Sequence, residues 1–399
     1  MIKIYYKIYM KKCMTFLLLL FSCFCQSQTK TNGFDIYIDV NYRNIDTNNV
    51  ESKAILKVWT SYLKSRILNW GSKNDTISSK FWNDDEQKLF THPCNIFELY
   101  PGLFLFHTSI LNIEPVENNY FRILNCNTAV DSSGNAEIYA IYYMLIKKIK
   151  SEFKLFNYFY LEKEKLNTTT IGTVKYYYPK NYEFSRLKAK RFINFKDSLA
   201  ILFNQPAQSK LEYVVATNTT YLMSLFGFII QKYLANSKNG KCVKENNMII
   251  SSIDENHRHE LVHYFTTNNY PDKIGFFDEG LATYFGGSMG HDLRWHINKF
   301  HTYFIFNMNS DTSKIMSLME IDRETNPKYT LGAIIMKYAI DNYGFQKALK
   351  LLSYSAKQYK PEDVIEKELG IPKAKLNSFL LDCMIKYPDF RPYKMEESH

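Results

Sequence analysis

The sequence predicts an α+β protein built from two successive domains, and three patterns along the chain support this. A helical stretch near the N-terminus is followed by short runs rich in Tyr, Phe, Ile and Leu, which are typical of antiparallel strands. The second half returns mainly to helical spacing, and its C-terminal part is expected to be almost entirely helical. A chain of 399 residues, 46% of them hydrophobic, is long enough to bury two cores.

The N-terminus has the pattern of a secretory signal peptide. Four lysines precede a largely apolar run at 14–24, and the first thirty residues contain no acid. Such a run is too short to span a bilayer but suits the hydrophobic region of a signal. We expect residues 1–27 to be removed, with cleavage after Cys25 or Ser27. The protein would then be periplasmic, at the cell surface or secreted.

A lipoprotein signal is the alternative reading of the same segment. Leu20-Phe21-Ser22-Cys23 loosely resembles a bacterial lipobox, and Cys23 would then carry a lipid that attaches the protein to the outer membrane. Phe21 is bulkier than that pattern normally allows. Both readings take the chain out of the cytoplasm.

The charge and the cysteines exclude two classes of protein. Loss of the four signal lysines lowers the formal charge from +10 to about +6, without any dense basic run, so nucleic-acid binding is not expected. Four cysteines remain in a long chain, too few for a disulfide scaffold. Cys94–Cys126 is the expected pair in an exported protein, and free buried thiols are the alternative. The other two cysteines are Cys242 and Cys383.

The first domain is expected over residues 28–180. An amphipathic helix is predicted at 48–69, closed by Gly71, and a shorter helical patch at 80–89. Aromatic and aliphatic runs separated by turn residues such as Pro101-Gly102 and Glu114-Pro115 then predict strands. These strands are expected at 96–111, 119–127, 136–149, 153–161 and 170–178.

The second domain is expected over residues 181–391. Strands are predicted at 211–217 and 247–251, the second just ahead of a helix that begins near Asp254 and runs through Phe265. A helix interrupted near Gly227 is predicted at 219–233. The other helices are expected at 184–203, 278–285, 329–343, 345–359, 361–369 and 373–384.

The motif His259-Glu260-Leu261-Val262-His263 organises the second domain. Two histidines four residues apart lie on one face of a helix, where both can hold one metal ion. The glutamate beside the first histidine can then act as a general base on a water molecule. Histidine is scarce, 9 of 399 residues, so chance produces such a motif in roughly one chain of this composition in a hundred.

A second block follows after fifteen intervening residues, Glu279-Gly280-Leu281-Ala282-Thr283-Tyr284. Together the two blocks resemble the gluzincins, zinc metallopeptidases of the HExxH type whose third ligand is a glutamate on the next helix. The resemblance implies a zincin domain with a mostly helical C-terminal subdomain that cuts a peptide or protein. It further implies that His259, His263 and Glu279 bind one Zn²⁺ ion and that Glu260 is the general base.

Two family features are missing, so the resemblance leaves the type of cleavage open. Thr283 stands where thermolysin-like enzymes place an acid four residues after the glutamate, and the GxMEN motif of aminopeptidases is not found. The resemblance also implies that the strand at 247–251 is an edge strand that lines the cleft and pairs with an extended substrate.

The transition state of such a reaction needs a further hydrogen-bond donor. Tyr329, in Tyr-x-x-Gly at the start of a helix, is the first candidate, and Tyr284 and His301 are alternatives. His257 is expected to be exposed. The spacing of His291, His296 and His301 does not place them on one helix face, so no second metal site is expected.

The first domain resembles, by element order alone, the cone-shaped α+β fold of the nuclear-transport-factor and SnoaL type. Its aromatic strands are read as a sheet core, with a ligand pocket as the alternative. For the whole chain we expect an exported zinc metallopeptidase. A catalytically silent binding protein on a zincin scaffold, and a zinc hydrolase acting on cell-wall amides, are the alternatives.

Overall fold

The computed structural model describes residues 38–68, 80–83, 107–130, 133–206, 209–231, 240–243, 247–307, 315–318, 321–322 and 324–387. Residues Ile38–His399 form one compact unit. The expected signal peptide, with Cys23, lies outside the described residues. No helix in the described ranges is long and apolar enough to cross a membrane.

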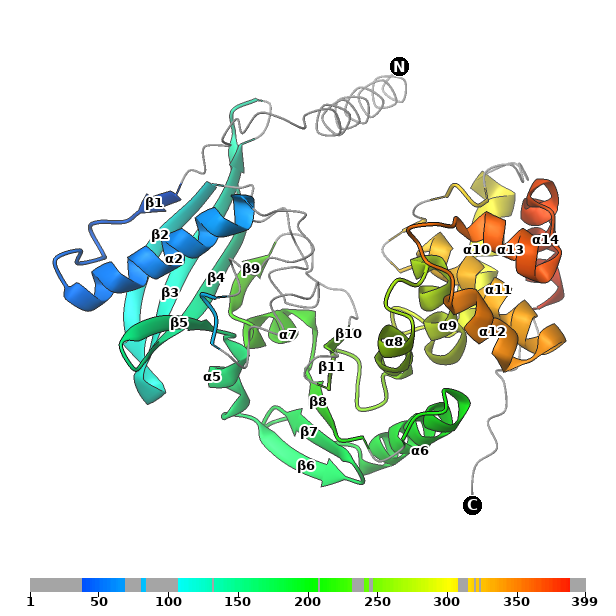
Figure 1. The fold of residues 1–399 in the computed structure, drawn as a ribbon, viewed down its shortest axis with the longest axis horizontal. Coiled ribbons are helices and arrows are strands. Elements are labelled where there is room, and N and C mark those ends of the chain that lie inside the picture. The colour runs from blue at the N-terminus through cyan, green and yellow to red at the C-terminus, as the bar shows by residue number, and fades with distance from the viewer. Residues whose placement is uncertain are drawn as a thin grey trace. The chain divides into compact units, whose positions relative to one another are not determined.

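The protein is a mixed α+β structure, as the sequence predicts, and it contains two open sheets (Figure 1). The first sheet has the strand order β1-β2-β3-β4-β5, with β9 paired to β4. All its pairs are antiparallel except β1 with β2. Its strands are β1 (Ile38–Val40), β2 (His107–Val116), β3 (Tyr120–Val130), β4 (Ala136–Ile149), β5 (Glu152–Phe156) and β9 (Phe228–Gln231).

Helix α2 (Val50–Leu68) packs against this first sheet (Figure 1). Its apolar side buries Trp59 and Tyr62 in one cluster with Ile110 and Ile123 of the sheet. The indole Nε1 of Trp59 donates a hydrogen bond of 2.8 Å to the buried Oδ1 of Asn125. The helix predicted at 48–69 is therefore confirmed, and a polar contact fixes it on the sheet.

The second sheet has the order β10-β11-β8-β7-β6. Its three central strands run parallel, and the two edge strands are antiparallel to their neighbours. The expectation that 247–251 forms an edge strand is wrong, because β11 pairs on both sides and β10 is the edge. The strands are β6 (Asn167–Ile171), β7 (Val174–Tyr178), β8 (Leu211–Val215), β10 (Gly240–Val243) and β11 (Met248–Ser251).

Both faces of the second sheet are buried, as expected for parallel strands. Tyr213 and Val215 of β8 belong to the large core of the helical half. Val214 of the same strand, and Ile250 of β11, point the other way into the core of the first sheet. The second sheet is thus the layer that joins the two cores.

Helices cover the face of the second sheet that carries Tyr213 and Val215. Helices α8 (Arg258–Asn269), α9 (Gly275–Gly286) and α11 (Pro327–Tyr343) carry the candidate site residues. The other helices are α5 (Phe159–Lys163), α6 (Arg186–Leu202), α7 (Thr219–Leu225), α10 (Leu293–Asn307), α12 (Phe345–Leu352), α13 (Pro361–Leu369) and α14 (Lys373–Lys386).

Several predicted elements differ from the structure where a turn was missed. The segment 153–161 is β5 followed by α5, and 170–178 is the end of a hairpin that turns at Gly172 with φ +56°. The helix predicted at 219–233 ends at Leu225, and β9 follows. Gly227 has φ +89°, and a Cβ there would lie 2.6 Å from the carbonyl oxygen of Tyr143, so the chain turns here to pair with β4.

Four smaller corrections concern Glu114-Pro115, the helix at 345–359, Cys126 and the helical patch at 80–89. The dipeptide lies within β2 instead of a turn, and the helix ends at Leu352. Cys126 is a buried free thiol, so the Cys94–Cys126 pair is not formed; Cys94 itself lies outside the described residues. The part of the patch 80–89 that the structure describes, 80–83, is a turn and a bridge to Leu155.

The domain boundary expected at 180/181 does not coincide with a break between the sheets. Strands β6 and β7 come from the first half of the chain but pair with β8 of the second half. Strand β9 comes from the second half and pairs with β4.

Replacement of Trp59 by Phe is expected to destabilise the protein by about 1–3 kcal/mol, because the buried Asn125 Oδ1 loses its donor. Urea unfolding of the purified protein measures this. Val50→Ala on the same helix is the control, since Val50 is 81% exposed. Equal midpoints for Trp59→Phe and the wild type would show that the Asn125 contact contributes nothing.

Candidate metal centre

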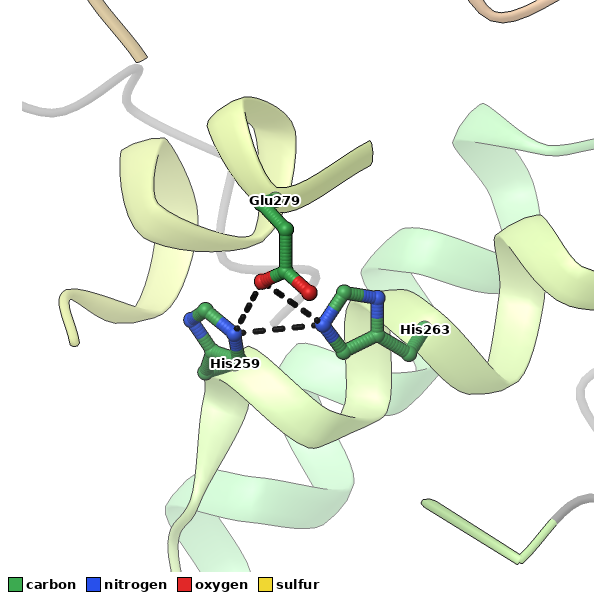
Figure 2. A group of neighbouring side chains, drawn as sticks. All are labelled: His259, His263 and Glu279. Atoms are coloured by element: carbon green, nitrogen blue, oxygen red, sulfur yellow. Dashed lines mark hydrogen bonds and ion pairs between the residues drawn. The ribbon is translucent and has the colours of Figure 1, made fainter. Parts of the chain in front are cut away.

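Two side chains of α8 and one of α9 converge on one point. His259 and His263 lie one turn apart on the same face of α8, and Glu279 reaches them from the second turn of α9. Figure 2 shows both imidazole rings and the carboxylate turned toward one another. The motif therefore brings together in space the three residues that the sequence marked as ligands.

The three ligand atoms are nearly equidistant. The His259 Nε2 and His263 Nε2 atoms are 3.1 Å apart. The Oε2 atom of Glu279 lies 3.2 Å from His259 Nε2 and 3.4 Å from His263 Nε2. Within the described ranges, these residues form a group that could hold a metal ion.

The outer nitrogen of each histidine has its own acceptor. His259 Nδ1 donates to the carbonyl oxygen of Gly287 over 2.7 Å. His263 Nδ1 donates to Oδ2 of Asp278 over 3.0 Å. These bonds place the proton on Nδ1 and leave Nε2 as the atom that can bind a metal.

Sequence reasoning missed both acceptors. Asp278 directly precedes Glu279, and an acid next to a candidate ligand is the one signal that could have suggested it. Its other oxygen, Oδ1, accepts a 2.6 Å bond from the hydroxyl of Thr266, and Lys273 Nζ lies 3.3 Å from Oδ2. The acceptor at Gly287 is a main-chain carbonyl, which has no signature in the sequence.

The charges around His263 shift the pKa values of the site. Burial lowers the pKa of His263, but the carboxylates of Asp278 and Glu279 outweigh it and raise that pKa well above its usual value. Burial raises the pKa of both carboxyl groups, and the histidines, with Lys273 beside Asp278, reverse this and lower it. Both acids are therefore held as carboxylates.

Glu260, which follows His259 on α8, is buried against the edge strand β10. A Cβ built on Gly240 of β10 would lie 2.9 Å from Glu260 Cγ and 2.2 Å from Cε1 of His257. The edge strand can approach α8 this closely because residue 240 is glycine. Glu260 also acts on Tyr329, since its charge contributes to raising the pKa of that phenol.

Of the three candidate hydrogen-bond donors, Tyr329 is the one that lies beside the three candidate ligands. Its ring centroid is 6.0 Å from that of His259. Burial, followed by the charge of Glu279 and a hydrogen bond to it, raises the pKa of Tyr329, so the hydroxyl keeps its proton. Tyr284 instead packs in the hydrophobic core against Phe285. His301 is half-buried on α10.

A close crossing of α9 and α11 brings Tyr329 to Glu279. Gly280 follows Glu279, and Gly332 lies one turn after Tyr329. A Cβ on Gly280 would be 2.4 Å from the carbonyl carbon of Gly332, and one on Gly332 would be 2.3 Å from the Phe276 oxygen. The two backbones touch, which fixes the side chains that flank the contact.

The remaining histidines differ from expectation in one case. His257, expected to be exposed, is buried at the N-cap of α8, and its Nδ1 lies 3.1 Å from the hydroxyl oxygen of Ser251. Burial, with the nearby His259 and His263, lowers its pKa to about 3. The helix begins at Arg258 rather than near Asp254, whose Oδ1 accepts from the amide of Asn256.

Two histidines outside the motif make defined contacts with their neighbours. His291 stacks on the ring of Trp295. His296 is buried, and its Nε2 donates to the carbonyl oxygen of Ser288.

No protein-family model matches this chain, and no curated protein matches it significantly.

Replacement of Gly332 by Ala is expected to lower stability by about 1–3 kcal/mol, because the added methyl group would meet the α9 backbone. Thermal unfolding measures the change. Gly275→Ala on α9 is the matched control, since a Cβ there meets nothing within 4 Å and alanine favours a helix. If both variants unfold at the wild-type temperature, the close crossing does not constrain the helices.

Proposed function

We propose that the protein is an exported zinc-dependent metallopeptidase of the gluzincin type. The observation that carries the proposal is the mutual spacing of the three ligand atoms, 3.1–3.4 Å. Zinc bonds to nitrogen and oxygen are about 2.0–2.1 Å long, and a tetrahedron of such bonds has edges of about 3.3–3.4 Å. Two imidazoles and a carboxylate on this spacing fit zinc and leave the fourth corner open.

The chemistry of the donor set supports the same assignment. Imidazole and carboxylate ligands suit zinc, and three protein ligands are typical of a catalytic rather than a structural site. Each histidine also has the hydrogen-bond acceptor that fixes a metal-binding imidazole.

In this proposal each side chain of the site has its own role in peptide hydrolysis. Bound zinc would supply a Lewis acid and lower the pKa of water at the open corner toward neutrality. Glu260 takes the proton from the attacking water and passes it to the leaving amine. The Tyr329 hydroxyl donates a hydrogen bond to the oxyanion that develops on the substrate carbonyl.

The fold agrees with the proposal in its order of elements. A sheet with an antiparallel edge strand precedes the α8 and α9 helices, and a helical C-terminal part follows them. We propose the zincin type of fold for the second sheet and the helices from α8 onward, and the SnoaL-like cone for helix α2 and the first sheet; neither follows the expected boundary between 28–180 and 181–391. Export, by the signal at 1–27 and with a lipid on Cys23 as the alternative, belongs to the same proposal.

Replacement of Glu260 by Gln is expected to lower peptide hydrolysis by about 10²–10⁴-fold while zinc stays bound, because the amide cannot accept the proton. The measurement combines metal analysis of the purified protein with cleavage of a broad peptide library. His259→Ala is the companion variant, which is expected to lose both zinc and cleavage.

Two outcomes would count against this function. A wild type that cleaves no better than Glu260→Gln would favour a binding protein on the same scaffold. A wild type that retains no zinc after gentle purification would remove the metal centre.

A further inference from the structure

We propose that His296 on α10 is a positioning residue of the metal centre. It holds the turn whose Gly287 carbonyl orients the imidazole of His259. The inference rests on the proposed zinc site and adds to it a residue that lies outside the two ligand blocks. We call residues Gly287–His291 the Gly287 turn.

The carbonyl of Gly287 is the acceptor that aims His259 at the shared point. It receives the Nδ1 proton of His259 over 2.7 Å. Thr283 of α9 does not supply an acceptor for His259. It is fully buried, and its hydroxyl has no hydrogen-bond partner among the described residues. The orientation of His259 therefore depends on where the backbone of the Gly287 turn lies.

Gly287 itself leaves α9 in a conformation that suits glycine. Its φ is +71°, and a Cβ there would lie 2.0 Å from the carbonyl oxygen of His291. Its amide still donates to the main-chain carbonyl oxygen of Thr283 over 2.9 Å. Since no side chain at 287 can pack and hold the turn, the support has to come from its neighbours.

The rest of the turn is a miniature hairpin. Ser288 and His291 exchange two backbone hydrogen bonds of 2.9 Å each. Met289 and Gly290 between them have φ values of +49° and +83°, the signs of a type I′ turn. The hairpin is well defined internally, but it needs a contact that fixes it to the body of the protein.

His296 makes that contact. Its Nε2 donates to the Ser288 carbonyl over 2.9 Å, and the residue is 1% exposed. The same carbonyl also accepts from the His291 amide, so both of its lone pairs are engaged. Helix α10 is anchored in the core through Ile297 and Phe300, the residues that follow.

The contacts form a continuous path from the core to the metal ligand. The path runs from α10 through His296 to Ser288, and from the neighbouring Gly287 carbonyl to His259. The two histidine ligands are thus held differently. A charged carboxylate, Asp278, holds His263, whereas a neutral carbonyl, positioned from α10, holds His259.

Replacement of His296 by Leu tests the proposal because it keeps an apolar side chain but removes the donor. We expect the zinc dissociation constant, measured by competition with a chelator, to rise about tenfold. This is the lower end of the loss of metal affinity seen when residues that orient metal ligands are replaced. The visible spectrum of the cobalt-loaded protein should also change, since it reports the ligand geometry. Neither readout needs an active enzyme.

His296→Gln is the matched variant, since its amide nitrogen can donate to Ser288 in place of Nε2. It should restore zinc affinity and the cobalt spectrum to nearly the wild-type values. Asn298→Ala on the exposed side of α10 controls for changes in the helix itself. If His296→Leu does not fold, Gly290→Val strains the turn at φ +83° without touching the core and should weaken zinc binding in the same way.

The outcomes separate the two proposals. A wild type that binds zinc, together with a His296→Leu variant of equal affinity and unchanged cobalt spectrum, overturns this inference alone. A loss of zinc affinity that Gln fails to restore also overturns it, because the effect would then come from packing. A wild type that binds no zinc overturns both this inference and the metal centre.

Discussion

The contact between the backbones of Gly280 and Gly332 is the constraint on which the candidate site depends. Each glycine lies beside or one turn from a site residue, Glu279 on α9 and Tyr329 on α11. Because no side chain separates the helices here, Glu279 and Tyr329 come within hydrogen-bonding reach. Helix α8 then needs only the correct rotation, which its buried face against the second sheet provides. The direct backbone contact between α9 and α11 thus determines where the polar side chains of the site meet.

Charge is distributed unevenly around the three ligand atoms. His263 faces two carboxylates, with Lys273 behind one of them, whereas the second partner of His259 is a neutral carbonyl. A metal ion bound between them would therefore meet one imidazole polarised by a full charge and one held mainly by geometry. This difference gives the two histidines distinct tasks, although they are equivalent in the motif.

The sequence predicted what local spacing determines and missed what distant neighbours determine. Helix α2, strand β4 and helix α13 follow from side-chain periodicity, and the convergence of His259 and His263 follows from their four-residue spacing on α8. Strand β9 was missed because its state depends on pairing with β4, far away in the chain. The burial of His257 was missed because it arises from contact with β10, which local spacing does not reveal. The role of Gly287 was missed because it acts through a main-chain carbonyl, which every residue possesses.

The second sheet, buried on both faces, makes the two halves of the protein inseparable in practice. Strands β6 and β7 lie before residue 181, and Val214 and Ile250 face the core built by the first sheet. A recombinant fragment that starts at residue 181 would lose two strands and present an apolar sheet surface and an unpaired β8 edge to water. Such surfaces promote aggregation. Work on the candidate site is therefore best done on the chain that retains both halves.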